Sequence, residues 1–246
     1  MEQIYRQTYK ITDLHVDCFG RARPSAIAFL AQSAAGGHCN LLKLDWETLA
    51  KRNLFWAIIR QRVQVNRLPV RGETVTVETW PLPTTRAAFP RATVCYDQQG
   101  NELFRAIALW ILMDLNTRAM VVPGKSGIDF PGCVVGGELP SPKSLTPKDL
   151  PDSTQRKVRF GQLDRNGHMN NTKYLEWVMD LLPGSFHGEH PLKSFAVCYL
   201  NESKEGDCVK LRHSLADNTL LVDATRPDPS EEGKSHRVFA VRAEFC

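Results

Sequence analysis

The stretch LDRNGHMNN, at residues 163–171, concentrates polar side chains of the kinds that hydrolytic sites use. Asp164, Asn166 and His168 stand at alternate positions, and two further asparagines follow. A carboxylate or an imidazole can activate a water molecule, while carboxamide and helix N-terminal N–H groups can stabilise an oxyanion. A turn and a helix cap need only one Asn each. The additional polar residues therefore indicate hydrolysis of an acyl group.

A helix is expected to begin near Asn170 or Asn171, because Asn is a favoured N-cap and an apolar stripe follows. The stripe contains Tyr174, Leu175, Val178, Leu181 and Leu182, and Pro183-Gly184 ends it. If residues 164–168 are extended, alternate side chains project to one side, close to the N–H groups and partial positive charge of the helix start. The alternative interpretation is an elaborate helix cap in which the other polar residues are incidental.

The two halves of the chain repeat one order of elements. VQVNRLPVRGETVTVE (63–78) aligns with VCYLNESKEGDCVKLR (197–212), and VDCFGRARPSAIAFLAQSA (16–34) aligns with LDRNGHMNNTKYLEWVMDL (163–181). Each half reads as strand, turn, helix and then several strands. A helix followed by strands must bury its apolar stripe on the sheet. The sequence thus predicts an α+β protein with two units, each a helix on an antiparallel sheet, whose sheets join into one continuous sheet.

The copies differ where the polar residues are. Asp164 aligns with Asp17, but three polar residues of the second copy align with other types: Asn166 with Phe19, His168 with Arg21, and Glu202 with Leu68. A motif needed only for folding should occur in both copies. The asymmetry therefore favours a functional site that is present once, in the second half.

These residues carry a family resemblance. LDRNGHMNNTKYLEW resembles the active-site segment of the acyl-acyl carrier protein (acyl-ACP) thioesterases of plants and bacteria, the FatA/FatB type, and YLNES resembles the segment that supplies the family's further catalytic Glu. FWAIIRQRVQVNRLPVRGETVTVETW resembles its first domain. The resemblance implies a double hot-dog fold, each domain a long helix wrapped by an antiparallel sheet. It divides the chain into an N-terminal domain with the acyl-chain pocket and a degenerate site (1–122), a Pro/Gly-rich linker (123–152) and a catalytic C-terminal domain (153–246).

The resemblance also implies the reaction, which is hydrolysis of acyl-ACP to a free fatty acid. Its catalytic residues would be Asp164, Asn166, His168 and Glu202. Asp164 and Glu202 would position and deprotonate a water molecule, and the other polar groups would orient it or stabilise the oxyanion. A covalent acyl intermediate on Asp164 is the alternative route. Where the plant enzymes have a Cys, this chain has Ser203, so no thiol nucleophile is available there.

An acyl-chain pocket is expected in the first half. The helix sequence PSAIAFLAQSAAGGH, at residues 24–38, is small and apolar, and the polar site is absent there. The same composition equally fits close packing of a helix on a sheet. Trp56 either lines this pocket or fills the core.

Charge and composition narrow the partners. The formal net charge is +4, and seven arginines crowd the first half: Arg60, Arg62, Arg67, Arg71, Arg86, Arg91 and Arg105. They are either solvated outer faces of strands or a docking surface for an acidic partner, here the acyl carrier protein. No nucleic-acid-binding motif accompanies them. No membrane span is expected, because the longest apolar stretch, AIALWILM at 106–113, is far shorter than the roughly 20 residues required.

No cofactor or metal is expected. The seven cysteines form no C-x-x-C pair, and no phosphate-binding or dinucleotide loop occurs. HGEH, at 187–190, has metal-like spacing but lies in an expected Gly/Pro loop without further ligands. The N-terminal sequence resembles neither a secretory signal nor a transit peptide, so a cytoplasmic protein of the bacterial branch is expected.

Three other functions fit parts of this pattern. An acyl-CoA thioesterase would use the same chemistry on a nucleotide thioester. A hot-dog dehydratase also uses a His and a carboxylate, but Glu202 and the Asp-x-Asn-x-His pattern argue against it. A non-catalytic acyl-binding module would not need all four polar groups in one copy. A monomer and a homodimer are both compatible with the sequence.

Overall fold

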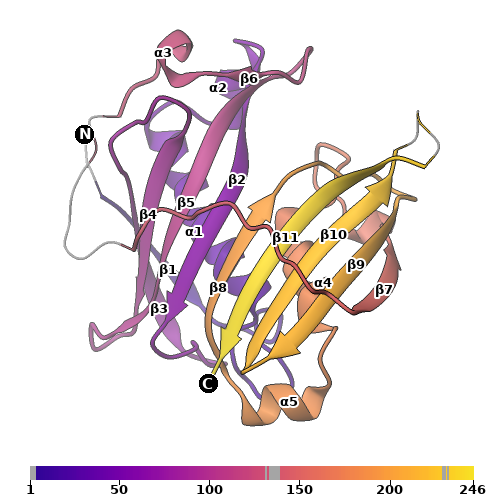
Figure 1. Ribbon diagram of the computed structural model, residues 1–246. Helices are drawn as coiled ribbons and strands as arrows, with labels where there is room; N and C mark the ends of the chain where they lie inside the picture. Colours follow the sequence, from indigo (N-terminus) through magenta and orange to yellow (C-terminus); the bar gives the residue numbers. More distant parts are fainter. Residues whose placement is uncertain (1–3, 131, 133–138, 229–230, 232) are drawn as a thin grey trace. The chain divides into compact units, whose positions relative to one another are not determined.

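The computed structural model describes residues 4–130, 132, 139–228, 231 and 233–246 of the chain. The chain divides into two compact units, residues 1–22 with 26–142 and residues 23–25 with 143–246 (Figure 1). Each unit combines an antiparallel sheet with helices, which confirms the α+β prediction. Among the described residues, no helix has both the length and the apolar character needed to span a bilayer.

The first unit is built on five long antiparallel strands. Its strands are β1 (Tyr5–Lys10), β2 (Leu54–Val65), β3 (Thr74–Pro81), β4 (Phe89–Tyr96), β5 (Glu102–Asp114) and the short β6 (Met120–Val121), and its helices are α1 (Pro24–Leu41), α2 (Trp46–Ala50) and α3 (Pro123–Ser126). The order in the sheet is β1-β3-β4-β5-β2, with β6 paired to β5. Apolar and polar residues alternate on β3, so Val75 and Val77 are buried.

The second unit repeats this topology. It contains β7 (Asp152–Lys157), a 3-10 turn (Phe160–Gln162), α4 (Asn171–Met179), α5 (Gly184–Glu189), β8 (Leu192–Tyr199), β9 (Cys208–Ala216), β10 (Thr219–Pro227) and β11 (Ser235–Phe245). The antiparallel order β7-β9-β10-β11-β8 is that of the first unit with each strand replaced by its counterpart. The internal repeat inferred from the sequence is therefore present in the fold.

Matching backbone hydrogen bonds align the two copies residue by residue. Four of these bonds form two equivalent pairs: Ala22 N–H to Pro69 C=O (2.7 Å) with Met169 N–H to Ser203 C=O (2.8 Å), and Gly72 N–H to Ile11 C=O (2.8 Å) with Gly206 N–H to Val158 C=O (3.0 Å). In the first pair, the residue that donates lies just before helix α1 or α4. The residue that accepts lies just after strand β2 or β8. Positions in the two copies can thus be compared directly.

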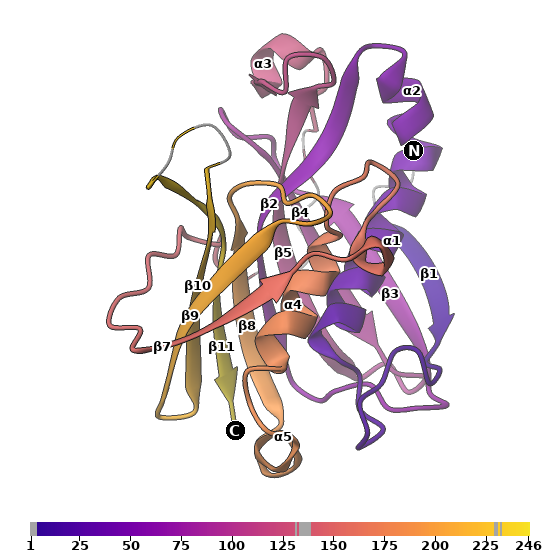
Figure 2. The ribbon, with the colours of Figure 1, turned by 90° about the vertical axis from the view of Figure 1, so that its right-hand side faces the viewer.

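Each unit packs a helix against its sheet through buried aromatic or polar contacts. In the first unit, His38 of α1 stacks on Tyr5 of β1 with ring centroids 5.8 Å apart. In the second, Tyr174 of α4 packs on Phe239 of β11 at 4.7 Å, and Figure 2 shows α4 lying along one face of this sheet. The helix ends at Met179, three residues earlier than the apolar stripe predicted, because the chain tightens into shorter-range bonds before Pro183.

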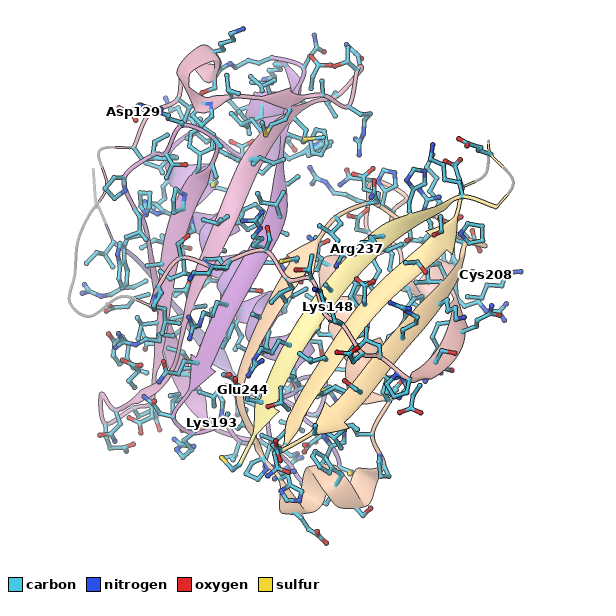
Figure 3. All side chains as sticks on the ribbon, viewed as in Figure 1. Asp129, Lys148, Lys193, Cys208, Arg237 and Glu244 are labelled. Atoms are coloured by element: carbon cyan, nitrogen blue, oxygen red, sulfur yellow. The ribbon has the colours of Figure 1, made fainter. Side chains whose placement is uncertain are left out.

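The segment expected to be a linker, residues 123–152, is packed where the structure describes it; residues 131 and 133–138 lie outside the described part. Ile128 is buried in the core of the first unit. In the second unit, the stretch that includes Lys148 runs across the sheet beside Arg237 (Figure 3). Arg237 on β11 donates to the Leu145 carbonyl (3.0 Å) and to the carboxylate of Asp223 (2.7 Å), which is buried. One side chain therefore fastens this stretch to the sheet.

Replacing Arg237 with Ala should lower the free energy of unfolding by about 1.5–3 kcal/mol, because Asp223 would stay buried without its charged donor. Urea denaturation of the variant measures this loss. Arg242→Ala is the matched control on the same strand. It removes an exposed pair with Glu244 and should change the stability by less than about 1 kcal/mol. Equal effects of the two substitutions would contradict the fastening role of Arg237.

Candidate functional site

Residues 164–168 form a tight turn and not the extended segment that the alternating pattern suggested. The Asp164 N–H donates to the His168 carbonyl (2.7 Å), and Gly167 takes the left-handed conformation with φ of 76°. The Asp164 carboxylate lies inside the turn, where Oδ1 accepts the N–H groups of Asn166 (2.8 Å) and His168 (3.3 Å). The prediction of an extended segment is wrong because these bonds stabilise the reversal.

The first unit has the same turn. Asp17 N–H donates to the Arg21 carbonyl (2.8 Å), and Asp17 Oδ1 accepts the N–H groups of Phe19 (2.9 Å) and Arg21 (3.0 Å). Gly20 has φ of 75°, which matches Gly167. Asp164 is therefore the one candidate with a counterpart of the same type and the same contacts. A structural function in the turn accounts for its presence in both copies.

His168 and Glu202 form the side-chain pair that occurs only in the second copy. His168 Nε2 lies 3.4 Å from Glu202 Oε2. The His168 side chain is 16% exposed and that of Glu202 is 48% exposed, so the pair opens toward solvent. Their backbones are brought together by a bridge between His168 and Lys204 and by the Met169–Ser203 hydrogen bond. The corresponding residues of the first unit, Arg21 and Leu68, cannot form such a pair.

The candidate residues fall into two contacting sets. Asp164 and Asn166 meet in the turn, where Asn166 Nδ2 lies 3.5 Å from Asp164 Oδ2. His168 meets Glu202 as described above. Glu202 lies outside the strands, because β8 ends at Tyr199 and residues 200–203 leave the ladder.

The expected helix start is confirmed. Asn170 is the N-cap of α4, and its side-chain oxygen accepts the N–H of Thr172 (2.9 Å) and the Thr172 hydroxyl (2.8 Å). Lys173 N–H donates to the Asn170 carbonyl (2.9 Å). Asn171 is the first helical residue. Because Asn170 already accepts the N–H groups of Thr172 and Lys173, the Asn171 N–H is the one best placed to donate to a further acceptor.

The Ser203 side chain is fully buried. A nucleophile must reach the carbonyl carbon of its substrate, so this burial agrees with the sequence argument against covalent catalysis at this position.

A pocket of about 290 Å³ lies within the first unit. Its wall includes residues of α1 and several aromatic side chains: Ala35, Gly36, Cys39, Trp56, Phe89, Trp110 and Phe130. Trp56 both lines this pocket and packs in the core, where its ring meets Phe89 edge-on at 5.0 Å and its Nε1–H donates to the Leu44 carbonyl (3.0 Å). The two alternatives for Trp56 are therefore not exclusive.

Arg91 was not predicted as a pocket residue. It lines the pocket, is only 6% exposed, and its Nη1 lies 3.1 Å from His38 Nδ1. Burial lowers the pKa of its guanidinium. The signal available in the sequence was its position inside FPRATVCY, an otherwise largely apolar strand. Phe130 gave no such signal, because its place depends on hydrogen bonds to Thr84, far away in the chain.

Most of the clustered arginines do not form a free basic surface. Arg67 pairs with Glu73 (2.6 Å), while Arg71 pairs with Asp13 and Arg105 with Glu102. Arg91 is buried. Only the rest of the set, Arg60, Arg62 and Arg86, is left to support the docking interpretation.

HGEH does not lie in a loop, because residues 184–189 form helix α5. His187 Nε2 donates to the Met179 carbonyl (2.9 Å) and His190 Nδ1 to the Cys246 carbonyl (2.8 Å). These bonds explain the two histidines as helix-end and terminal contacts. Within the described ranges, no three or more His, Cys, Asp or Glu side chains are grouped to hold a metal ion.

Comparison with known families identifies two matches, one in each half of the chain. Residues 2–123 match the model of the acyl-ACP thioesterase N-terminal domain, and residues 146–239 match that of the acyl-ACP thioesterase C-terminal domain. Among curated proteins, the chain is 26% identical over 247 residues to a palmitoyl-acyl carrier protein thioesterase of Cuphea hookeriana. It is 27% identical over 217 residues to a dodecanoyl-[acyl-carrier-protein] hydrolase of Cinnamomum camphora. These alignments cover 94% and 81% of this chain but 56% of each relative, so the chain spans little more than half of their length.

Two solved structures share the fold. An acyl-ACP thioesterase from Bacteroides thetaiotaomicron superposes with a TM-score of 0.89 at 22% identity, over 99% of this chain and 98% of that one. The 12:0-ACP thioesterase from Umbellularia californica superposes with a TM-score of 0.81 at 24% identity, over 100% of this chain and 98% of that one. The predicted fold class of tandem hot-dog domains is confirmed by these likenesses.

The matched turns allow the structural function of Asp164 to be measured separately. Asp17→Ala and Asp164→Ala should each lower the free energy of unfolding by about 1–2 kcal/mol, because each removes a carboxylate that accepts two backbone N–H groups. Urea denaturation of the two variants gives both values. A loss in one variant with none in the other would show that the two turns are not equivalent.

Proposed function

Because the chain belongs to the acyl-ACP thioesterase family, we propose that it hydrolyses the thioester of acyl-ACP, which releases a free fatty acid and ends elongation of the acyl chain. The observation that carries the proposal is the His168–Glu202 pair, which is present in one of two otherwise matching copies. A general acid–base pair at one site is what hydrolysis of a thioester requires.

In the proposed reaction, Glu202 accepts a proton from a water molecule, and the water oxygen attacks the carbonyl carbon of the thioester. The tetrahedral intermediate then collapses, the carbon–sulfur bond breaks, and the proton returns to the leaving sulfur. His168, at 3.4 Å from Glu202, orients the carboxylate and takes part in this proton transfer. The products are a carboxylic acid and the thiol of the carrier.

The oxyanion of that intermediate is assigned to the start of α4. The Asn171 N–H and the positive end of the helix follow His168 closely in the chain, and the exposed Asn166 carboxamide offers a second donor. Asn170 contributes indirectly, because its side chain caps the helix. Asp164 holds the turn that presents Asn166 and His168, so we assign it a positioning role and favour direct attack by water over an acyl-Asp intermediate.

The acyl chain is assigned to the pocket of the first unit, with Trp56 as one of its walls. Support comes from its largely apolar lining and from the lack of a polar pair at the corresponding positions of that unit. Enlarging the pocket by Trp56→Ala should shift the preferred chain length without changing the chemistry at Glu202.

The function is tested by measuring free fatty acid release from a panel of acyl-ACPs of medium to long chain length, with matched acyl-CoAs in parallel. Release from acyl-ACP alone supports the proposal. The internal pairing of Arg67, Arg71 and Arg105 weakens the charge argument for a protein carrier, so the CoA arm is essential. Equal cleavage of acyl-CoA would contradict the assignment of acyl carrier protein as the specific carrier and leave the thioesterase reaction in place. No cleavage of either thioester would sink the proposal and favour the dehydratase or binding functions.

Glu202→Ala and His168→Ala should each lower kcat by about 10²–10⁴-fold, because each removes one member of the acid–base pair. Both side chains are at least partly exposed, so the melting temperature should change little. Steady-state kinetics and thermal melting are the measurements. A loss of activity that merely follows unfolding would point to a structural function for the pair.

Ser203→Ala should retain far more activity than these variants, because the buried hydroxyl cannot reach a substrate. The same kinetic assay measures it. A loss as large as that of Glu202→Ala would count against the water mechanism and reopen a nucleophilic role for Ser203.

A further inference from the structure

Three hydroxyl groups are buried in the second unit, and one of them belongs to Ser203, the residue that follows Glu202. They belong to Tyr174 of α4, Tyr199 at the end of β8, and Ser203, and we call them the hydroxyl cluster. Tyr174 is 3% exposed and Ser203 is 0% exposed. In the part of the chain that the structure describes, none of the three oxygen atoms has a hydrogen-bond partner. Buried hydroxyls without partners destabilise a fold, so their presence calls for an explanation.

Tyr174 lies near each of the other two groups of the cluster. The rings of Tyr174 and Tyr199 are 6.2 Å apart. Burial raises the pKa of Tyr174 to about 12, the nearby hydroxyl and N–H of Ser203 act against this rise, and the charge of Glu202 adds to it. Ser203 is thus near enough to influence Tyr174, although the two hydroxyls are not in hydrogen-bonding geometry. Tyr174 stays protonated at neutral pH, so it is available as a donor.

The first unit shows that the fold does not need these hydroxyls. The matched backbone bonds align Tyr174 with Ile27, Tyr199 with Val65 and Ser203 with Pro69. Ile27 is 0% and Val65 8% exposed, so both apolar side chains are buried at these positions. Apolar side chains therefore satisfy the same positions where no acid–base pair is present. The hydroxyl cluster accompanies Glu202 and His168 and not the architecture.

We propose that the three hydroxyls of the cluster form a hydrogen-bond network bridged by a buried water molecule. Through this network, Tyr174 and Ser203 act as positioning residues for the Glu202 carboxylate. The inference rests on the proposed function. A buried water needs two to four polar partners, which the cluster supplies. Ser203 transmits the constraint because it follows Glu202 directly and its carbonyl is tied to Met169, next to His168.

Tyr174→Phe removes one hydroxyl and keeps the ring that packs on Phe239. It should lower kcat about tenfold, leave KM within about twofold and leave the melting temperature nearly unchanged, because positioning is lost while the packing of the ring is kept. Tyr199→Phe and Ser203→Ala should act in the same direction. Tyr9→Phe is the matched control, because it removes a buried hydroxyl from the first unit and should leave kcat unchanged.

The decisive measurement combines Tyr174→Phe with Glu202→Gln. If the hydroxyl acts through Glu202, Tyr174→Phe should cause no further loss of kcat in the Glu202→Gln background. A full additional loss there would overturn the inference. A kcat equal to that of the wild type, or a loss that accompanies a lower melting temperature, would also overturn it.

These outcomes separate the inference from the function on which it rests. An active wild type with an unaffected Tyr174→Phe variant overturns the inference alone. A wild type that hydrolyses neither acyl-ACP nor acyl-CoA overturns the function and this inference with it. A high-resolution crystal structure adds a direct readout, because a water molecule hydrogen-bonded to the three hydroxyls is expected. A cluster without this water would contradict the proposed network.

Discussion

One backbone hydrogen bond positions the proposed acid–base pair of the second unit. The Met169 N–H donates to the Ser203 carbonyl and joins the residue after the turn to the segment that leaves β8. Because each partner has a polar neighbour, the bond holds His168 against Glu202. The turn, the helix cap and the strand end all converge on this contact. A backbone bond is insensitive to side-chain identity, so the arrangement persists whichever residues flank it.

The first unit illustrates that insensitivity. Its Ala22–Pro69 bond and its Asp17 turn reproduce the geometry, but Arg21 and Leu68 flank the contact. The duplicated chain thus contains its own reference state, in which the same backbone carries no acid–base pair. At the positions around this contact, the polar side chains that only the second unit has form two groups. One group is the partly exposed His168–Glu202 pair, and the other consists of the buried hydroxyls of Tyr174, Tyr199 and Ser203.

Sequence reasoning predicted the repeat, the helix start at Asn170 and the nearness of Glu202 to the turn, because each leaves a local signal or an alignment. It failed at residues 164–168, where period-two spacing was taken for an extended chain although Asp164 and Gly167 favour a turn. It did not find the pocket position of Arg91 or Phe130, since those contacts join distant segments. It aligned Asp164 with Asp17 but did not anticipate that both carboxylates accept backbone N–H groups of their own turns. Residue type alone cannot reveal whether a carboxylate faces its own backbone or a substrate.

The strand order also constrains when the second unit can form during synthesis. Strand β11 follows the other strands of the second unit in the chain, yet it lies between β8 and β10 in the sheet. The Leu145 carbonyl also cannot be hydrogen-bonded to Arg237 until that residue is synthesised, 92 residues later. Contacts this distant in sequence close slowly, because the intervening loop must first be ordered. Until β11 is in place, the edges that β8 and β10 present to it stay unpaired, and unpaired strand edges favour wrong pairing and aggregation.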